Sequence, residues 1–367
     1  MNSYQCTLYG VKSLNKLQQF LQIEQKTHFK NLSLNLTSNP MGYYSSFTNQ
    51  DNRLVFKCSK YITKLHKKIM KLFNIEQASY LKSGVKKESH ITNAKEHQNS
   101  NFFLLVDIKS FYPSITKSKI KTQLIQNYKQ SKDVAEFISN LVTIPQEKAL
   151  GKRALVTGSP LSQWFAYMIN KKMFDELNKI SKEENIIFSV YVDDITFSSK
   201  KVVTYKFYTK VYNIIKKYGY RIHQGKMYRG KLGNKTKITG IQFTKYGFRL
   251  LDKHKEKIRK IRDSKDCPNQ IKSLLGLINF AVQVNPKYSK YKYLIEKKLL
   301  LNHSILSNQP NKPNRNKNQR HKRPHNQPTN RPIAPRGVSL SNPMAEPCAT
   351  GSIPTEIANA VITQVGF

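Results

Sequence analysis

At residues 186–197 the chain reads Ile-Ile-Phe-Ser-Val-Tyr-Val-Asp-Asp-Ile-Thr-Phe, so two adjacent carboxylates, Asp193 and Asp194, interrupt an apolar, β-branched run. Residues of this kind favour a buried strand, in which an ionised carboxylate is costly unless it is paired or bound to a metal ion. Two strands that meet at these acids would form a hairpin with both carboxylates at its tip, where they could bind a divalent cation. A surface turn with two solvated aspartates is the alternative interpretation.

A second run, Phe-Phe-Leu-Leu-Val-Asp-Ile-Lys-Ser-Phe-Tyr-Pro at residues 102–113, has the form of a strand that ends at the single carboxylate Asp107. Phosphoryl transfer with two metal ions needs hard oxygen ligands from separate strands, which hold two Mg²⁺ roughly 3.5–4 Å apart. One acid at a strand end and one in a hairpin meet this need. The sequence therefore predicts that the two runs lie side by side.

The charge of the chain is strongly one-sided. It has 63 Lys and Arg against 22 Asp and Glu, a formal net charge of +41 over 367 residues, together with 20 Tyr and 18 Phe. Basic residues interleaved with aromatic ones suit contacts to phosphates and stacking on bases. Generic solubilising charge is the alternative, but the excess favours a nucleic acid as partner. A hydrophobic content of 38% is enough for a packed core, so the chain as a whole is not expected to be disordered.

Cysteine usage and hydropathy indicate a protein of the reducing cytoplasm. Cys6, Cys58, Cys267 and Cys348 are far apart and form no paired motif for zinc or for a disulfide framework. No apolar run approaches the ~20 residues of a membrane span, and the N-terminal residues lack the apolar core of a signal peptide. We expect no membrane association.

Hydrophobic periodicity predicts an α+β core. The expected helices cover residues 11–30, 61–70, 120–142, 158–180 and 205–218, and the further expected strands are 53–56 and 237–243. The polar residues 83–101 are expected to form an exposed loop. Residues 253–301 form a basic helical region, with a buried stripe of Ile271, Leu274, Leu275, Leu277 and Ile278.

The composition changes after this region. Residues 308–337 contain six prolines, eight Lys or Arg and no acid, so they cannot bury enough apolar surface to fold alone. We expect a disordered basic tether. Residues 353–367 regain apolar character and form either a short docking helix or an untethered end.

Several short motifs resemble those of one known family. Tyr191-Val192-Asp193-Asp194 resembles the YxDD box of reverse transcriptases, and the segment from Asp107 to Tyr112 resembles the preceding box that supplies the third carboxylate. Within that family the chain is most similar to the retron type. Asn93-Ala94-Lys95-Glu96-His97 resembles the retron Asn-Ala-x-x-His box, and Ile238-Thr239-Gly240 resembles its Val-Thr-Gly box. The resemblance covers roughly residues 43–300.

The resemblance implies a right-hand polymerase fold. Fingers and an N-terminal helical region would occupy residues 1–100, a palm with an antiparallel sheet residues 101–250 and a helical thumb residues 251–305, followed by a disordered basic tail at 306–367. Asp107, Asp193 and Asp194 would be the catalytic, metal-binding acids. They would hold two Mg²⁺, with Mn²⁺ as an alternative.

The resemblance also implies roles for other residues. Tyr112 would pack under the sugar and exclude a 2′-hydroxyl, and Gly158 would let the backbone approach the nucleotide. Lys226 would stand near the leaving pyrophosphate. The alternatives are core packing for Tyr112 and a solvated position for Lys226. Residues expected to order a loop or contact RNA or primer are Asn93, His97, Tyr191, Thr239 and Gly240. The alternative for His97 is a loop histidine whose hydrogen bonds are all made within the protein.

One box departs from the family pattern. Reverse transcriptases commonly have Gln-Gly before Ser-Pro, whereas this chain has Thr157-Gly158-Ser159-Pro160. A threonine puts in doubt any template or nucleotide contact of the usual glutamine. Because the metal ligands are intact, we do not interpret this as loss of activity.

The implied function is RNA-directed DNA polymerisation on a dedicated structured non-coding RNA that acts as template and primer. The product would be a branched RNA–DNA molecule (msDNA) used in anti-phage defence, with dNTPs as substrates and an effector protein as a further partner. Two alternatives stay open. One is another bacterial reverse transcriptase, defence-associated or related to group II introns, and the other is a non-catalytic RNA-binding protein on a polymerase scaffold.

Overall fold

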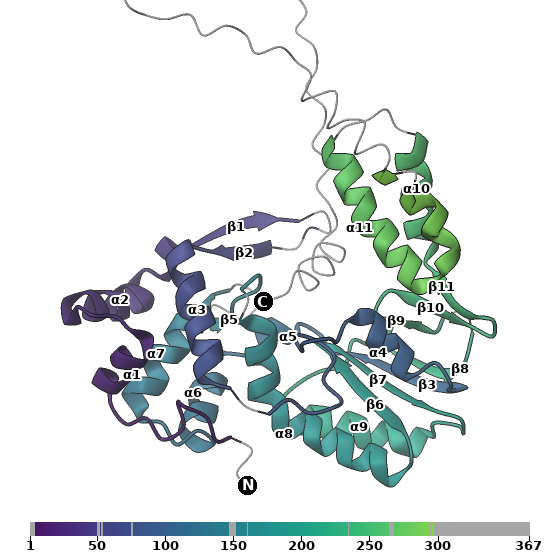
Figure 1. The fold of residues 1–367 in the computed structure, drawn as a ribbon. Coiled ribbons are helices and arrows are strands. Elements are labelled where there is room, and N and C mark those ends of the chain that lie inside the picture. The colour runs from purple at the N-terminus through teal and green to yellow at the C-terminus, as the bar shows by residue number, and fades with distance from the viewer. Residues whose placement is uncertain are drawn as a thin grey trace, which may run out of the picture.

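The computed structural model describes residues 4–296, apart from residues 50–51, 53, 75, 147–151, 160, 234, 264–267 and 294. The expected tail at 306–367 therefore lies outside the described residues. Within them, helices are combined with antiparallel sheets, which confirms the α+β class (Figure 1). None of the helices that the structure describes combines the length and hydropathy needed to cross a membrane.

The central sheet has four antiparallel strands in the order β6-β7-β3-β8. These are β3 (Phe102–Asp107), β6 (Ile187–Tyr191), β7 (Asp194–Ser199) and β8 (Tyr228–Lys231). Leu104 and Val106 of β3 belong to the large core that includes α8 (Ser162–Glu183) and α9 (Tyr205–Lys217). These two helices lie beneath the sheet (Figure 1). Because side chains alternate along a strand, Phe103 and Asp107 point to the opposite face, where Phe103 joins a second, smaller core.

An N-terminal helical region packs beside this sheet (Figure 1). Its helices are α1 (Leu14–Leu21), α2 (Lys26–Ser38), α3 (Lys60–Leu72), α6 (Lys117–Gln126) and α7 (Lys132–Val142), with the short η1 (Pro40–Tyr43). Two hairpins complete it: β1 (Tyr44–Thr48) with β2 (Leu54–Cys58), and β4 (Thr143–Pro145) with β5 (Arg153–Leu155).

Two expected helices are each divided. The prediction of one helix over residues 11–30 is wrong because Gln22 adopts a left-handed conformation with φ 53° and ends α1. The predicted helix at 120–142 is likewise two helices, since Lys129 has φ 53° and α7 begins at Lys132. Apolar periodicity continues across both breaks, so it gives no sign of them. The predictions at 61–70, 158–180 and 205–218 are confirmed with shifted ends as α3, α8 and α9.

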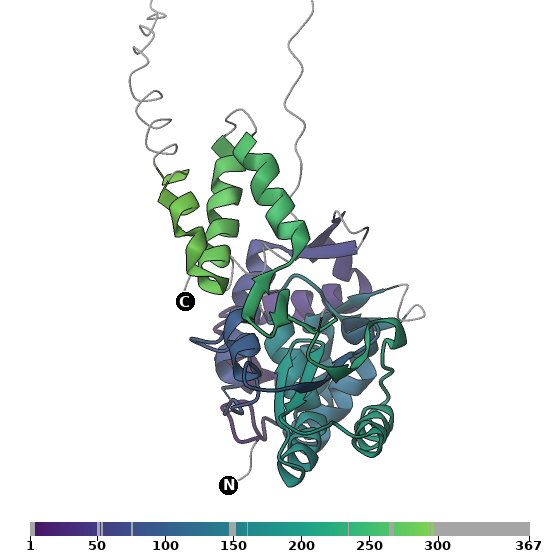
Figure 2. The same cartoon turned by 90° about the vertical axis from the view of Figure 1, so that its right-hand side faces the viewer.

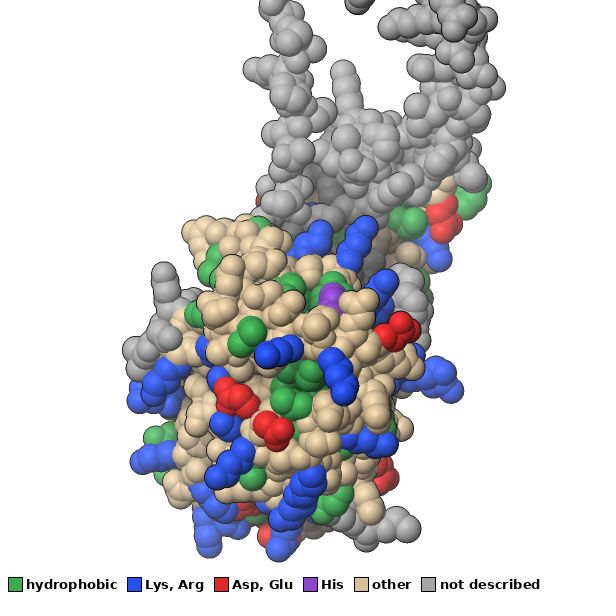
Figure 3. Space-filling view, turned by 90° about the vertical axis from the view of Figure 1, so that its left-hand side faces the viewer, with side chains coloured by type: hydrophobic (Ala, Val, Ile, Leu, Met, Phe, Trp, Pro, Cys, Tyr) green, Lys and Arg blue, Asp and Glu red, His purple; other side chains and the backbone are tan. Residues whose placement is uncertain are grey.

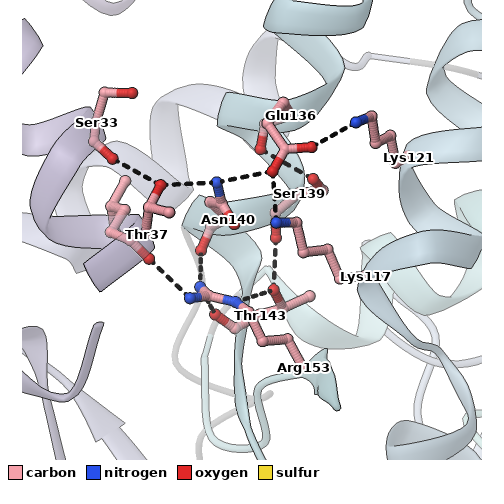
Figure 4. Close-up of polar contacts among 10 residues, drawn as sticks. Ser33, Thr37, Lys117, Lys121, Glu136, Ser139, Asn140, Thr143 and Arg153 are labelled. Atoms are coloured by element: carbon pink, nitrogen blue, oxygen red, sulfur yellow. Dashed lines mark hydrogen bonds and ion pairs between the residues drawn. The ribbon is translucent and has the colours of Figure 1, made fainter. Parts of the chain in front are cut away.

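Arg153 joins the ends of two helices in this region (Figure 4). Its guanidinium donates to the carbonyl of Leu36 in the last turn of α2 at 2.8 Å, and to the carbonyls of Asn140 and Thr143 at the end of α7 at 2.7 and 2.6 Å. Helix C-termini leave carbonyls without intrahelical partners. One half-buried side chain therefore satisfies carbonyls at two helix ends and fixes α2 against α7.

The expected exposed loop at 83–101 is wrong, because it contains the helix α4 (His90–Glu96). Ser89 and Thr92 form a reciprocal capping box at its start, in which Ser89 Oγ accepts from the Thr92 amide and Thr92 Oγ1 accepts from the Ser89 amide. Ile91 and Ala94 are buried in the smaller core. A short helix with few apolar residues gives a weak periodic pattern, and the capping residues were the available signal.

The single strand expected at 237–243 is a hairpin. β9 (Lys237–Ile238) and β10 (Ile241–Thr244) pair through Ile238 and Ile241. The two residues between them, Thr239 and Gly240, have φ of 44° and 82°. Positive φ at both central positions is the pattern of a type I′ turn, and glycine at the second position favours it. β10 then pairs with β11 (Gly247–Leu250).

The C-terminal helical region comprises α10 (Asp252–Asp263), α11 (Pro268–Val284) and the short η4 (Pro286–Tyr288), and it stands above the sheet beside β9–β11 (Figures 1 and 2). These helices agree with the helical region predicted from residue 253 onward. Leu274, Leu277 and Ile278 of the predicted stripe are buried and Leu275 is partly buried, while the Ile271 side chain lies outside the described part of the chain.

Candidate active site

The turn between β6 and β7 holds the first of the predicted acids. Tyr191 pairs with Asp194, which leaves Val192 and Asp193 as the two turn residues. Asp194 is therefore the first residue of β7, whereas the sequence predicted both acids at the tip. Val192 has φ 60°, a conformation that is a genuine outlier for a β-branched residue. The turn thus carries backbone strain that the surrounding contacts must hold.

The segment around Ser83 supports this turn. Ser83 Oγ accepts a hydrogen bond from the Val192 amide at 3.0 Å. One residue before, Lys82 donates its amide to the Val190 carbonyl at 2.9 Å, and Val190 donates to the Tyr80 carbonyl at 2.9 Å. Residues 80–83 therefore lie along β6 as a short parallel partner, which the sequence analysis did not identify.

The register of β3 against β7 brings the third acid to the same place. Asp107, the last residue of β3, lies directly opposite Asp194, and the Ile108 amide donates to the Asp193 carbonyl at 3.2 Å. Opposed residues of an antiparallel pair point to the same face with Cβ atoms about 5 Å apart. The two acidic runs thus lie side by side as predicted, although 85 residues separate the ends of the segments in sequence (107 to 193).

Lys226 faces this group of acids. It ends η3 (Gln224–Lys226), and its Nζ lies 2.9 Å from Asp107 Oδ2. The Asp107 side chain is 14% exposed and that of Lys226 is 51% exposed. The His223 amide donates to the Asp107 carbonyl at 2.8 Å, so the backbone before Lys226 is also fixed to the end of β3. Lys226 is therefore an ion-pair partner of a candidate catalytic acid rather than a separate surface lysine.

Tyr112 lies beside the hairpin on the short helix α5 (Phe111–Ser114). Burial raises the pKa of its hydroxyl, and the nearby charges of Asp193 and Tyr191 raise the pKa further. Burial, followed by the charge of Asp194, also raises the pKa of Tyr191. Both phenols therefore stay protonated and can act only as neutral groups next to the acids.

The donor set at this site fits a hard divalent cation, because carboxylate oxygens are the ligands that Mg²⁺ and similar ions prefer. Within the described residues, however, no three Asp, Glu, His or Cys side chains are already arranged as a metal site. The Asp107 carboxylate instead accepts a hydrogen bond from the Lys226 ammonium. A metal ion would compete with that ammonium for the same carboxylate.

Gly158 has a structural reason to be glycine. Its φ is 83°, and a Cβ atom there would lie 2.3 Å from the carbonyl oxygen of Phe56 in β2. The next residue, Ser159, is held by His66 of α3, whose Nδ1 lies 2.6 Å from Ser159 Oγ. The backbone at Gly158 was expected to approach a nucleotide closely. In the structure it closely approaches the backbone of β2 instead. Thr157, which replaces the usual glutamine, keeps its hydroxyl oxygen buried with no hydrogen-bond partner.

Asn93 and His97 are fully buried, each with 0% exposure. Asn93 Oδ1 accepts from Ser189 Oγ at 2.7 Å, and the two ring nitrogens of His97 lie 2.7 Å from Ser189 Oγ and Ser198 Oγ. Thr239 is linked to the same group, since its Oγ1 lies 3.4 Å from Asn93 Nδ2. The residues of the two retron-like boxes therefore contact one another inside the protein. The sequence analysis missed Ser189 and Ser198, whose inward-facing positions in two strands were the available signal.

Comparison with known proteins agrees with this geometry. A family model described as reverse transcriptase (RNA-dependent DNA polymerase) matches residues 47–243, more than half of the chain. The chain is 26% identical over 212 residues to the Retron Ec83 reverse transcriptase of Escherichia coli, which covers 54% of this chain and 67% of that protein. It is 26% identical over 256 residues to the Retron Se72 reverse transcriptase of Salmonella heidelberg, with coverage of 66% and 64%.

A third relative, the Retron Mx162 reverse transcriptase of Myxococcus xanthus, is 25% identical over 178 residues, which covers 42% of this chain and only 36% of that protein. The matched parts thus span from about a third to two thirds of these relatives. The matches confirm the resemblance to retron-type reverse transcriptases that the motifs indicated.

Proposed function

Since the chain belongs to the reverse transcriptase family, we propose that it is an RNA-directed DNA polymerase whose active site is formed by Asp107, Asp193 and Asp194. The observation that carries the proposal is the register of β3 and β7, which sets Asp107 opposite Asp194 and next to the turn at Asp193. Three acids from two distant segments meet where β3 ends and β7 begins. They are the donor set that two-metal phosphoryl transfer needs.

Each residue has a distinct role in this proposal. Mg²⁺ or Mn²⁺, when bound by the three carboxylates, would lower the pKa of the primer hydroxyl and balance charge on the dNTP phosphates. The Lys226 ammonium, half exposed and already beside Asp107, can turn to the leaving pyrophosphate and donate a proton there. Tyr112 packs under the incoming sugar, where its ring leaves no room for a 2′-hydroxyl. Tyr191 supports the primer end, and Gly158 acts on the nucleotide site only indirectly, by letting its backbone pack against β2.

The proposed layout is that of a right hand. Residues 1–100 would form the fingers with the N-terminal helices, residues 101–250 the palm that contains the central sheet, and residues 251–305 the thumb. The described helices α10 and α11 stand above the central sheet, beside β9–β11 (Figures 1 and 2), which supports this layout. The tail at 306–367 would be a basic tether.

We further propose that the template and primer are one dedicated structured RNA, and that the product is a branched RNA–DNA used in anti-phage defence. The names of the relatives, which are retron reverse transcriptases, support this step. So does the net charge of +41. Figure 3 shows a face of the molecule on which Lys and Arg are spread widely, with Asp and Glu among them. An effector protein would be a further partner.

Polymerase activity can be tested directly. The purified chain is expected to extend oligo(dT) on poly(rA) with dTTP and Mg²⁺. A variant with Asp193→Asn and Asp194→Asn is expected to lose this extension, because an amide lacks the negative charge that the metal ions need at this site. Asp252→Asn is the matched control, since Asp252 is 86% exposed at the start of α10. Equal extension by all three proteins, or none by the wild type, would refute the proposal.

The retron step has its own test. Protein purified from producing cells is expected to carry RNA with covalently attached DNA, which nuclease treatment and gel mobility reveal. Recovery of RNA alone from cells in which the polymerase is active would leave the polymerase proposal intact and reject the retron RNA.

A further inference from the structure

A continuous line of side-chain hydrogen bonds crosses the face of the central sheet on which Asp194 lies, further along the strands β6 and β7. It begins at Ser100, passes through His97 and ends at a backbone carbonyl of α4. In order, its links are Ser100 Oγ to Ser198 Oγ (2.8 Å), Ser198 Oγ to His97 Nδ1 (2.7 Å), His97 Nε2 to Ser189 Oγ (2.7 Å), Ser189 Oγ to Asn93 Oδ1 (2.7 Å), Asn93 Nδ2 to Thr239 Oγ1 (3.4 Å) and Thr239 Oγ1 to the His90 carbonyl (2.6 Å). We call this line the His97 relay.

The directions of the bonds between His90 and His97 can be deduced from the last member of the relay. A carbonyl oxygen only accepts, so Thr239 donates its proton to His90 and must accept from Asn93 Nδ2. The amide oxygen of Asn93 then faces Ser189, which donates to it. Because Ser189 has given away its only proton, it accepts from His97 Nε2.

The same reasoning fixes the state of the histidine. With the proton on Nε2, Nδ1 of a neutral ring is an acceptor, so Ser198 donates to it and in turn accepts from Ser100. Burial, and then the charge of Lys82, lowers the pKa of His97 to about 3. The bond pattern thus requires a proton on Nε2, and the lowered pKa makes the neutral ring with an accepting Nδ1 the form present at neutral pH.

The relay connects three parts of the molecule that are separate in sequence. Ser189 lies in β6 and Ser198 in β7, the two strands that carry the turn with Asp193. Asn93 and His97 belong to α4 and the residue that ends it. Thr239 is in the turn between β9 and β10, from which the chain continues through β11 into α10.

All relay side chains except that of Thr239, which is partly buried, are also sealed from solvent. Asn93, His97, Ser189 and Ser198 have 0% exposure, and Ser100 has 3%. Buried polar groups that lack one partner are costly, so the loss of one member leaves its neighbours unsatisfied and favours a shift of the strands that hold them. A nucleic acid cannot reach Asn93 or His97 in this arrangement without opening the core.

We propose that His97 is a positioning residue, and that its relay sets the position of the hairpin carrying Asp193 relative to the Thr239 turn at the base of α10 and α11. This inference rests on the proposed polymerase function for its kinetic consequences. It assigns internal roles to Asn93, His97 and Thr239. The relay makes the placement of the catalytic acids depend on that of α10 and α11 in the proposed thumb.

The first part of the test separates the relay from ordinary core packing. Ser189→Ala is expected to lower kcat about tenfold, since the hairpin moves when Asn93 and His97 lose a partner, while KM for the dNTP changes little. Ser181→Ala is the matched control: Ser181 is also 0% exposed and donates to a carbonyl, that of Leu177 in α8, outside the relay. Equal kinetics of the two variants would overturn the proposal.

The second part measures the coupling. Thr239→Val removes the hydroxyl and is expected to shorten DNA products, whereas Thr239→Ser keeps the hydroxyl and should restore their length. In a double-mutant cycle of Ser198→Ala with Thr239→Val, the double variant is expected to lose less than the product of the single losses, because each single change already breaks the relay. If the loss in the double variant equals the product of the two single losses, the two sites are independent and no coupling passes through His97.

The third part does not depend on activity. ¹⁵N NMR of the full chain is expected to show His97 with its proton on Nε2 and no titration between about pH 5 and 8. Double-mutant cycles of thermal stability provide the same coupling without a polymerase assay. If the wild type proves inactive as a polymerase, these two measurements still show whether the relay exists. A titrating His97, or one protonated on Nδ1, contradicts it.

Discussion

Val192 shows how single residues shape this site. A valine at φ 60° is strained, and the Ser83 hydroxyl that binds its amide helps to hold it there. The positive φ permits the two-residue turn, so that Asp193 sits at its tip and Asp194 lies opposite Asp107. The position of the catalytic acids thus depends on contacts made by their uncharged neighbours.

Tyr112 gives a prediction on substrate choice. Replacing it with alanine is expected to raise incorporation of ribonucleotides relative to deoxynucleotides by at least about tenfold, because the space for a 2′-hydroxyl opens. Tyr112→Phe keeps the ring and should keep the discrimination. Single-nucleotide extension with dTTP and UTP measures the ratio, and an unchanged ratio in the alanine variant would indicate that Tyr112 serves only to pack the core.

Gly158 gives a prediction on stability. Gly158→Ala forces a Cβ against the Phe56 carbonyl, which lies 2.3 Å from its position, in a backbone with φ 83°. We expect the free energy of unfolding to fall by about 2–4 kcal/mol. Gly219→Ala is the control, with φ 76° but no atom within 4 Å of the added Cβ, and should cost only about 1 kcal/mol. Similar losses measured by urea unfolding would rule out the steric explanation.

Helices α6 and α7 are joined by an acid between two lysines. Glu136 of α7 pairs with Lys117 and Lys121 of α6, as Figure 4 shows. Burial alone would raise the pKa of Glu136, but the hydrogen bonds and charges of the two lysines outweigh it and hold the pKa at about 2. Asn140 and Arg153 continue the polar contacts toward α2. The helical region is therefore fixed by polar bonds as well as by its core.

This pair of helices should respond to acid. A carboxyl whose pKa is lowered on folding contributes stability above its unfolded pKa of about 4.5, and that contribution is lost as the pH falls toward 2. Glu136→Gln is therefore expected to cost about 1 kcal/mol at pH 7, since the carboxylate is partly exposed and screened by solvent. The cost should shrink below about pH 4. Thermal unfolding of both proteins at pH 7 and about pH 3 checks this, and a constant difference would contradict it.

The charge of the entire chain has consequences for binding. With +41 distributed over 367 residues, association with RNA should depend steeply on salt. Residues 308–337, outside the described part of the chain, contribute eight Lys and Arg without an acid. If they contact RNA, each phosphate neutralised adds about 0.7–0.9 to the slope of log K against log salt.

A chain that ends at Leu301 is therefore expected to bind its RNA with a slope smaller by several units and with unchanged kcat on poly(rA)/oligo(dT). Fluorescence anisotropy at several salt concentrations measures the slope. The same slope in both chains would show that the basic tail does not contact the RNA.

The acidic strands, the aromatic after Asp107 and the α+β class were predictable because they are local: a β-branched run, a carboxylate at its end and a helical repeat are read within ten or twenty residues. Local signals also marked features that were misassigned, such as the Thr239-Gly240 turn and the Ser89 capping box. The register that sets Asp107 opposite Asp194 was not local, since strand pairing depends on contacts between segments far apart in the chain.

The burial of Asn93 and His97 was likewise decided by the tertiary structure. Their polar surroundings in the sequence favoured an exposed loop, and their partners Ser189, Ser198 and Thr239 lie about a hundred or more residues away. A polar side chain can be buried only where a fold supplies donors and acceptors at the right positions. No pattern in the residues around it can show whether those partners will be there.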